Sequence, residues 1–143
     1  MLKGVPAILS PELLKVMMEM GHGDELVIGD GNFPAASMAR RLIRADGHGV
    51  PELLEAIMKF FPLDGFVDRP AALMQVVPGD STRPTIWEKY RSILKAADAN
   101  FKDFELVERF DFYERSKQAY AILATGEAAI YANIILKKGI VVE

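Results

Sequence analysis

The side chains best suited to acid–base chemistry lie in one stretch near the N-terminus. His22 lies between two glycines, whose small size lets a ligand approach the backbone closely. Histidine is also the side chain that most readily exchanges a proton near neutral pH. Asp30 follows an apolar run, where a loop rich in turn residues begins. These residue types fit an acid–base site, and they equally fit a solvent-exposed histidine and an aspartate that caps its own loop.

A second group of polar side chains lies in the C-terminal half. Arg109 could hold a hydroxyl or carboxylate of a ligand, or it could form a surface ion pair. Tyr113 and Tyr131 each offer a hydroxyl, although tyrosines often pack in the core with only that group in water. Asn133 offers a donor and an acceptor, which suits recognition of sugar hydroxyls. The group contains no nucleophile beside a base, so it does not favour covalent catalysis.

Metal and nucleotide sites are less well supported by the sequence. A metal-dependent hydrolase would use His22, Asp24 and His48, but their spacing matches no zinc pattern. A glycine-rich dinucleotide loop must follow a strand, whereas Gly21 and Gly23 precede the apolar run. We therefore expect no metal, and the metal hydrolase stands as a minor alternative.

Helices are predicted at regular intervals along the chain. Ser10 can cap a helix whose first residue is Pro11. Apolar residues at helical spacing predict further helices over residues 51–61 and 84–97. Asp111 is the predicted cap of another helix, because a glutamate follows it three positions later as in a capping box.

Strands are predicted between these helices. They cover residues 25–29, 42–45, 71–77, 104–109, 120–125 and 133–137. The alternation indicates an α/β fold over residues 1–143: a single domain of three layers, with a mostly parallel central sheet flanked by helices. The last two strands are expected to add an antiparallel edge. His22 precedes the first strand and Asp30 ends it, so they meet only if the His22 loop folds back or another subunit completes the site.

Composition limits the classes of function. The chain has 143 residues, half of them apolar, which suits one domain with a sizeable core. No apolar run reaches the roughly 18 residues of a membrane span, and the start of the chain does not resemble a signal peptide. The net charge is −3 and the basic residues are scattered, so we expect no nucleic-acid partner. The absence of cysteine fits a cytoplasmic protein.

Short pieces of the sequence form an ordered set that spans nearly the whole chain. They are residues 9–14, 20–25, 33–34, 43–47, 109–110, 112–115, 125–127 and 131–139, together with Asp30. In this order they resemble the L-fucose mutarotase family, which is related to D-ribose pyranase. Ala132 stands where many fucose enzymes have glycine and the ribose branch has alanine. Residues 112–115 and the closing Leu-Lys-Lys-Gly run resemble the fucose branch more closely.

The resemblance implies an isomerase that interconverts the α and β anomers of a free sugar, most closely L-fucose. It implies that His22 is the proton donor. The implied substrate-binding residues are Asp30, Asp64, Arg109, Tyr113, Tyr131, Ala132 and Asn133. It also implies a homo-oligomer, a ring-shaped decamer with sites at subunit interfaces, that uses no metal or cofactor.

Mutarotation itself requires only two proton transfers. An acid protonates the ring oxygen while a base takes the anomeric hydroxyl proton, and the ring opens, rotates about C1–C2 and closes on the other face. One well-placed acid–base group supplies about 10²–10⁴-fold in rate. We expect His22 to be that group, with Asp30 and Arg109 holding the sugar and Tyr131 and Asn133 orienting its hydroxyls. A D-ribose pyranase and a sugar-binding module without catalysis would use the same polar residues and remain alternatives.

Overall fold

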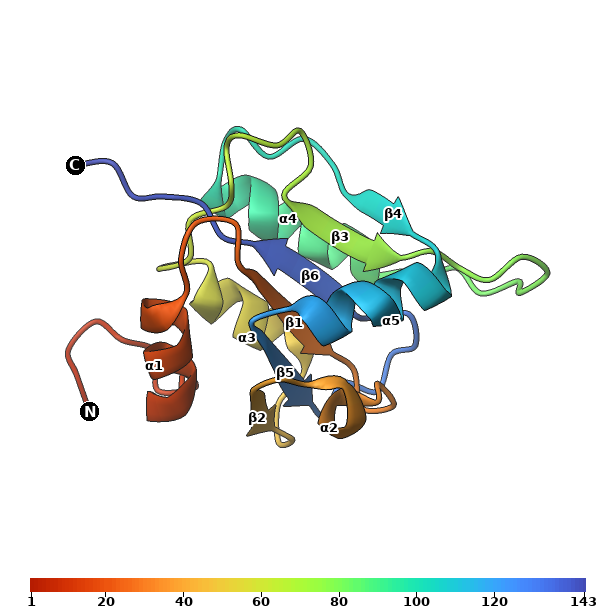
Figure 1. Cartoon of the computed structure of the whole chain (residues 1–143), viewed down its shortest axis with the longest axis horizontal. Helices are drawn as coiled ribbons and strands as arrows, with labels where there is room; N and C mark the ends of the chain where they lie inside the picture. Colours follow the sequence, from red (N-terminus) through yellow and green to blue (C-terminus); the bar gives the residue numbers. More distant parts are fainter.

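The computed structural model describes all 143 residues as five helices packed on a six-stranded sheet (Figure 1). The helices are α1 (Pro11–Glu19), α2 (Ala35–Met38), α3 (Val50–Ile57), α4 (Ile86–Ala97) and α5 (Arg109–Gln118). The strands are β1 (Glu25–Gly29), β2 (Leu42–Ala45), β3 (Ala71–Met74), β4 (Glu105–Val107), β5 (Ala121–Thr125) and β6 (Ile134–Lys137). None of the helices is long and apolar enough to cross a bilayer.

The sheet has the strand order β2-β5-β1-β6-β3-β4. Neighbouring strands are parallel except where β6 pairs with β1 and β3. The predicted α/β fold with a mostly parallel sheet is confirmed, but the predicted antiparallel edge is wrong. β5 is parallel to its neighbours, and β6 lies inside the sheet. Residues 126–133 pass the carboxyl end of β1, so β6 begins where β5 ends and must run back the other way.

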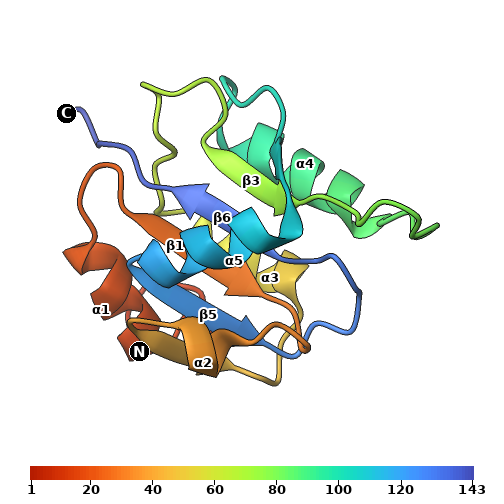
Figure 2. The same cartoon turned by 45° about the vertical axis from the view of Figure 1, so that its right-hand side comes forward.

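Helices cover both faces of this sheet (Figure 2). On one face, α1, α3 and α4 pack with Leu26 and Ile28 in a cluster of 28 buried residues. On the other face, α2 and α5 pack with Val27 and Ile122 in a cluster of 10 buried residues. Successive side chains of a strand point to opposite faces, so β1 contributes to both clusters. Burial of both faces explains why the strand sequences are almost entirely apolar.

The starts of α1 and α5 test the predicted caps. Ser10 caps α1 as predicted, because its hydroxyl accepts the Leu13 amide at 3.1 Å. The cap predicted for α5 at Asp111 is wrong. The Glu108 carboxylate accepts the amides of Phe110 and Asp111 at 2.9 and 3.0 Å. α5 therefore begins earlier, at Arg109, which is a residue of its first turn and not the end of a strand.

Three predicted elements end earlier than expected, among them the strand predicted over residues 104–109, which covers only Glu105–Val107. The strand predicted over residues 71–77 is confirmed only as far as Met74, after which the chain leaves the sheet for a projecting loop (Figure 1). The helix predicted over residues 51–61 ends at Ile57, and turns continue to Phe60. The shortened β3 matters for the site, because its end forms one wall of the pocket described next.

Candidate active site

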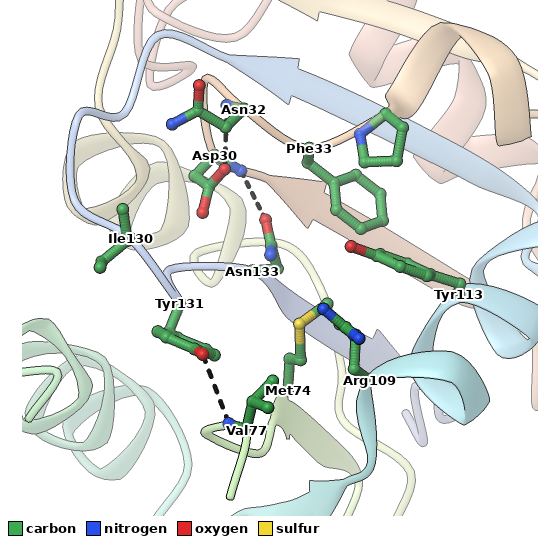
Figure 3. A pocket seen from close by; sticks show the side chains of 11 residues that line it. Asp30, Asn32, Phe33, Met74, Val77, Arg109, Tyr113, Ile130, Tyr131 and Asn133 are labelled. Atoms are coloured by element: carbon green, nitrogen blue, oxygen red, sulfur yellow. Dashed lines mark hydrogen bonds between the residues drawn. The ribbon is translucent and has the colours of Figure 1, made fainter. Parts of the chain in front are cut away.

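An open pocket of about 210 Å³ lies at the edge of the sheet where β1 and β3 end and β6 begins (Figure 3). Its lining residues are Asp30, Asn32, Phe33, Pro34, Met74, Val77, Arg109, Tyr113, Ile130, Tyr131 and Asn133. The carboxyl edge of a largely parallel sheet is where ligands bind in open α/β folds. Five of the predicted site residues therefore meet in one place, although they come from distant parts of the sequence.

Asp30 is the buried acid of this pocket, with 6% of its surface exposed. Its Oδ1 accepts the Asn32 amide at 3.0 Å, and its Oδ2 accepts the Ala132 amide at 3.3 Å. Burial raises the pKa of Asp30, these amides oppose the rise, and the negative charge of Glu127 adds to it. The net effect is a pKa above the usual value, so Asp30 takes up a proton more readily than an exposed aspartate.

Asn133 is held in a single orientation beside Asp30. Its Oδ1 accepts the backbone amide of Asp30 at 2.8 Å (Figure 3). Because Oδ1 is already engaged, the Nδ2 group is the part of the side chain left to donate to a ligand. Ala132, between Tyr131 and Asn133, is fully buried and contributes its amide to Asp30 rather than a side chain to the pocket.

Tyr131 adopts a backbone conformation that is rare for a side chain of its size. Its φ is 55°, the only positive value at a non-glycine residue in the chain. Helix α4 holds this conformation in place: Trp87 Nε1 donates to the Tyr131 carbonyl at 2.8 Å, and the Tyr90 hydroxyl donates to the Ala132 carbonyl at 2.7 Å. Strained residues of this kind concentrate at functional sites, where the surrounding structure stabilises them.

The hydroxyl of Tyr131 is already occupied. It donates to Asp80 Oδ2 at 2.7 Å and accepts the Val77 amide at 3.3 Å. The hydrogen bond to the Asp80 carboxylate raises the pKa of Tyr131. The ring of Tyr131 is therefore what it offers to a ligand, and its hydroxyl serves to fix the ring against the loop that follows β3.

Arg109 and Tyr113 face the pocket from α5. The guanidinium of Arg109 lies over the Phe110 ring, 4.5 Å from its centre. Its Nε is buried and has no hydrogen-bond partner within the chain, which is unusual for a buried donor. The Tyr113 ring packs against Phe33 at 5.9 Å, and its hydroxyl points toward the pocket (Figure 3). These two residues offer free polar groups opposite Asp30.

His22 does not lie in this pocket. It precedes β1, whereas Asp30 follows it, and the five residues of β1 separate the two ends of the strand. At about 3.3 Å per residue the separation is on the order of 15 Å or more. The loop does not fold back over the strand, because Gly23, with a φ of 88°, donates its amide to the Lys138 carbonyl at 2.8 Å. His22 and Asp30 of one chain cannot contact the same small sugar.

His22 is paired with Asp64 instead. Its Nε2 lies 3.0 Å from Asp64 Oδ1, and its ring centre lies 5.3 Å from that of Phe66. Burial favours a higher pKa for Asp64, but the Phe66 amide and His22 outweigh burial and lower it. An ionised Asp64 can only accept, so Nε2 carries the hydrogen and Nδ1 is the nitrogen left for a ligand. The His22 side chain is 44% exposed, so a ligand can reach it.

The second histidine is separate from both of these groups. His48 Nδ1 lies 3.4 Å from Glu52 Oε1 at the start of α3. Asp24 accepts the Gly21 amide at 2.7 Å and so stabilises its own turn. The chain has no group of three or more His, Cys, Asp or Glu residues placed to hold a metal ion. His22, Asp24 and His48 are thus not brought together as the metal-hydrolase alternative requires.

Sequence reasoning missed the residues that support the site. The apolar walls contributed by Phe33, Met74 and Ile130 are not distinguishable by type from core residues. The sequence offers one signal that Trp87 and Tyr90 make polar contacts. They lie three positions apart in a helix, and each has a polar atom that needs a partner when buried. That signal indicates a polar contact but not its location.

The chain is similar to proteins of one known family over nearly its whole length. The model of the RbsD / FucU transport protein family matches residues 3–141. The chain is 52% identical to the fucose mutarotase of Homo sapiens, over 97% of this chain and 94% of that protein. It is 53% identical to the fucose mutarotase of Streptococcus pneumoniae, whose crystal structure in complex with L-fucose superposes with a TM-score of 0.93 over 99% of this chain and 100% of that one. Bacillus subtilis RbsD, solved with D-ribose, shares the fold at a TM-score of 0.73 and 20% identity, covering 99% of this chain and 100% of that one.

Proposed function

The chain belongs to the RbsD / FucU transport protein family, and we propose that it interconverts the α and β anomers of L-fucose. The observation that supports this best is the identity of more than half of the residues, over nearly the full length, with proteins named fucose mutarotase. The pocket around Asp30 supports the same function, because it gathers a buried carboxylate, an arginine and an asparagine amide. The protein is thus an isomerase that acts on a carbohydrate.

The pocket supplies the groups that would hold the sugar during ring opening. Ionised Asp30 accepts hydrogen bonds from sugar hydroxyls, and the free donors of Arg109 and Asn133 bind hydroxyl oxygens opposite it. The ring face of Tyr131 packs against the apolar side of the sugar, and the Tyr113 hydroxyl can donate or accept. Held in this way, the sugar presents its ring oxygen and anomeric hydroxyl to an acid–base group.

We propose that this acid–base group is His22 of a second copy of the chain. Within one chain His22 lies at the wrong end of β1, so a site containing both His22 and Asp30 needs two copies. Apolar side chains are exposed at both ends: Phe66 is 76% exposed beside His22, and Phe110 is 60% exposed beside Arg109. Exposed apolar groups of this kind mark protein interfaces. A head-to-tail contact of this type forms a ring when the rotation between copies closes, which fits the expected decamer.

Asp64 acts on His22 in this scheme. It is held ionised, and it fixes the hydrogen on Nε2, so that Nδ1 faces the sugar. The residues require no metal or cofactor, because Nδ1 of His22 can take the anomeric hydroxyl proton and return it to the ring oxygen as the ring opens. A chain without cysteine is also compatible with the reducing cytoplasm, where we place the protein.

Two other functions use the same residues. A D-ribose pyranase would open the ring in the same way. Bacillus subtilis RbsD, solved with D-ribose, shares the fold of this chain. A sugar-binding module would bind fucose in the same pocket without accelerating its anomer exchange.

The test is saturation-transfer NMR of the anomeric protons of L-fucose and D-ribose with the purified protein. We expect faster exchange for fucose. Faster exchange for ribose alone would favour the pyranase, and bound fucose without faster exchange would favour the binding module.

A further inference from the structure

Glu127 joins three segments beside the Asp30 pocket without lining the pocket itself. Its Oε1 accepts the Val50 amide, at the start of α3, at 3.0 Å, and its Oε2 accepts the Ala129 amide at 3.1 Å. Its backbone carbonyl accepts the amide of Gly31, the residue after Asp30, at 2.8 Å. One residue therefore ties the turn that carries Asp30 to the first turn of α3.

Glu127 packs closely against two glycines and is hydrogen-bonded to a third segment. A Cβ atom at Gly31 would lie 3.0 Å from the Glu127 carbonyl oxygen, and one at Gly49 would lie 3.1 Å from its Oε1. Thr125 Oγ1 accepts the Glu127 amide at 3.2 Å and donates to the Gly29 carbonyl, at the end of β1, at 2.7 Å. The Glu127 segment is thus fixed relative to Asp30 by contacts on both sides of it.

Other titratable and charged groups surround Asp30 from every packed element. Tyr90 approaches from α4, Arg109 and Tyr113 from α5, and Tyr131 from the segment before β6. The charges of Glu127 and Asp30 both act on Tyr90, whose pKa is raised chiefly by burial. Glu127 is the carboxylate whose charge acts on Asp30 itself. A negative charge near a carboxyl disfavours the ionisation of that carboxyl.

We propose that Glu127 is a positioning residue that acts through Asp30: it holds the Asp30 turn against α3 and keeps a second negative charge near the Asp30 carboxyl. It does not touch the sugar. The inference rests on the proposed function for the role of Asp30 in catalysis. The effect of the Glu127 charge on the Asp30 carboxyl does not depend on sugar, because it is present in the free protein.

The chain offers a matched control for this proposal. Glu52 is also a carboxylate at the start of α3, where its Oε1 accepts the Gly49 amide at 2.9 Å. The experiment compares Glu127→Gln with Glu52→Gln. The Asp30 carboxyl carbon is titrated by NMR in the free protein, and fucose exchange is measured against pH. In Glu127→Gln the pKa of Asp30 should fall measurably, because one negative charge is lost. The acid limb of activity should move to lower pH by the same amount, and Glu52→Gln should change neither.

The proposal fails if the pKa of Asp30 is unchanged in Glu127→Gln, or if Glu52→Gln lowers it as much. Glu127→Asp keeps the charge but withdraws it by one methylene group, so its Asp30 pKa should lie between the wild-type and Glu127→Gln values. If Glu127→Gln does not fold, Glu127→Asp is used in its place. An Asp30 pKa in Glu127→Asp equal to that of the wild type would then overturn the proposal. The titration needs no sugar, so a protein that failed to accelerate fucose exchange would refute the proposed function and leave this result intact.

Discussion

At the residue scale, the two aspartates next to the proposed chemistry are tuned in opposite directions. Asp30 and Asp64 are both buried, and burial alone raises the pKa of a carboxyl. At Asp30 burial prevails and the pKa is raised. At Asp64 the Phe66 amide and His22 prevail and the pKa is lowered. The result is one carboxyl that takes up a proton readily and another that stays ionised beside the proposed proton donor.

Residue types and neighbours predict roles for His22 and Asp30, but they do not predict the residues that these side chains contact. His22 is 42 positions from Asp64, and Asp30 is 103 positions from Asn133. The order of the strands brings these residues together, so no local sequence pattern predicts the contacts. The loop around His22 could be predicted from the sequence. Its position far from the Asp30 pocket could be seen only once the fold was known.

The histidines provide the first prediction. His22→Ala should lower the enzyme-catalysed anomer exchange of L-fucose by about 10²–10⁴-fold, because it removes the proposed acid–base group. His48→Ala is the matched control, since His48 also lies between two glycines but pairs only with the exposed Glu52. Saturation-transfer NMR measures both. Equal activity in the two folded variants would remove His22 from the mechanism.

The second prediction concerns pH. A raised pKa means that Asp30 binds its proton at a higher pH than an ordinary aspartate does. If ionised Asp30 holds the sugar, activity is full above that pKa and is lost as the pH falls through it. The acid limb of the exchange rate should therefore lie above the usual aspartate range. A limb within the usual range would show that Asp30 does not govern the rate.

At the scale of elements, helix α4 supports the site without lining it. Trp87 and Tyr90 lie on the face of α4 that packs against the segment before β6, and they hold the carbonyls of Tyr131 and Ala132. The bounds of β1 and β2 followed from apolar runs between turn residues and are confirmed. The interior position of β6 could not be predicted, because it depends on a connection that passes the end of β1. The start of α5 was missed because a longer side chain, Glu108, supplies the cap.

Tyr90→Phe is the element-scale prediction. The change leaves the Ala132 carbonyl buried without its partner, which should lower the free energy of unfolding by about 1–3 kcal/mol. It should also raise the KM for fucose, because the strained Tyr131 is held less firmly. Tyr120→Phe is the control: it removes a hydroxyl that bonds the exposed Glu19, and it should change stability little. Chemical denaturation and NMR exchange measure the two effects. Equal losses of stability would show that α4 has no special role.

At the scale of the whole molecule, the proposed chemistry is divided between the two ends of β1. The Asp30 pocket lies at the carboxyl end, and the His22–Asp64 pair lies at the other. Apolar side chains are exposed beside each end, including Phe66 at one and Phe110 at the other. In the proposed scheme, one copy carries both halves of a site that it cannot assemble alone. With head-to-tail association, every copy would supply His22 to one site and Asp30 to another.

The most direct test of this division mixes two inactive variants. His22→Ala and Asp30→Asn are co-expressed, and the L-fucose exchange rate of the mixed oligomer is compared with that of each variant alone. If each site takes His22 from one copy and Asp30 from another, random assembly restores about one quarter of the sites, and exchange should recover to about that fraction of wild type. No recovery in mixed oligomers that are shown to contain both variants would contradict the shared site.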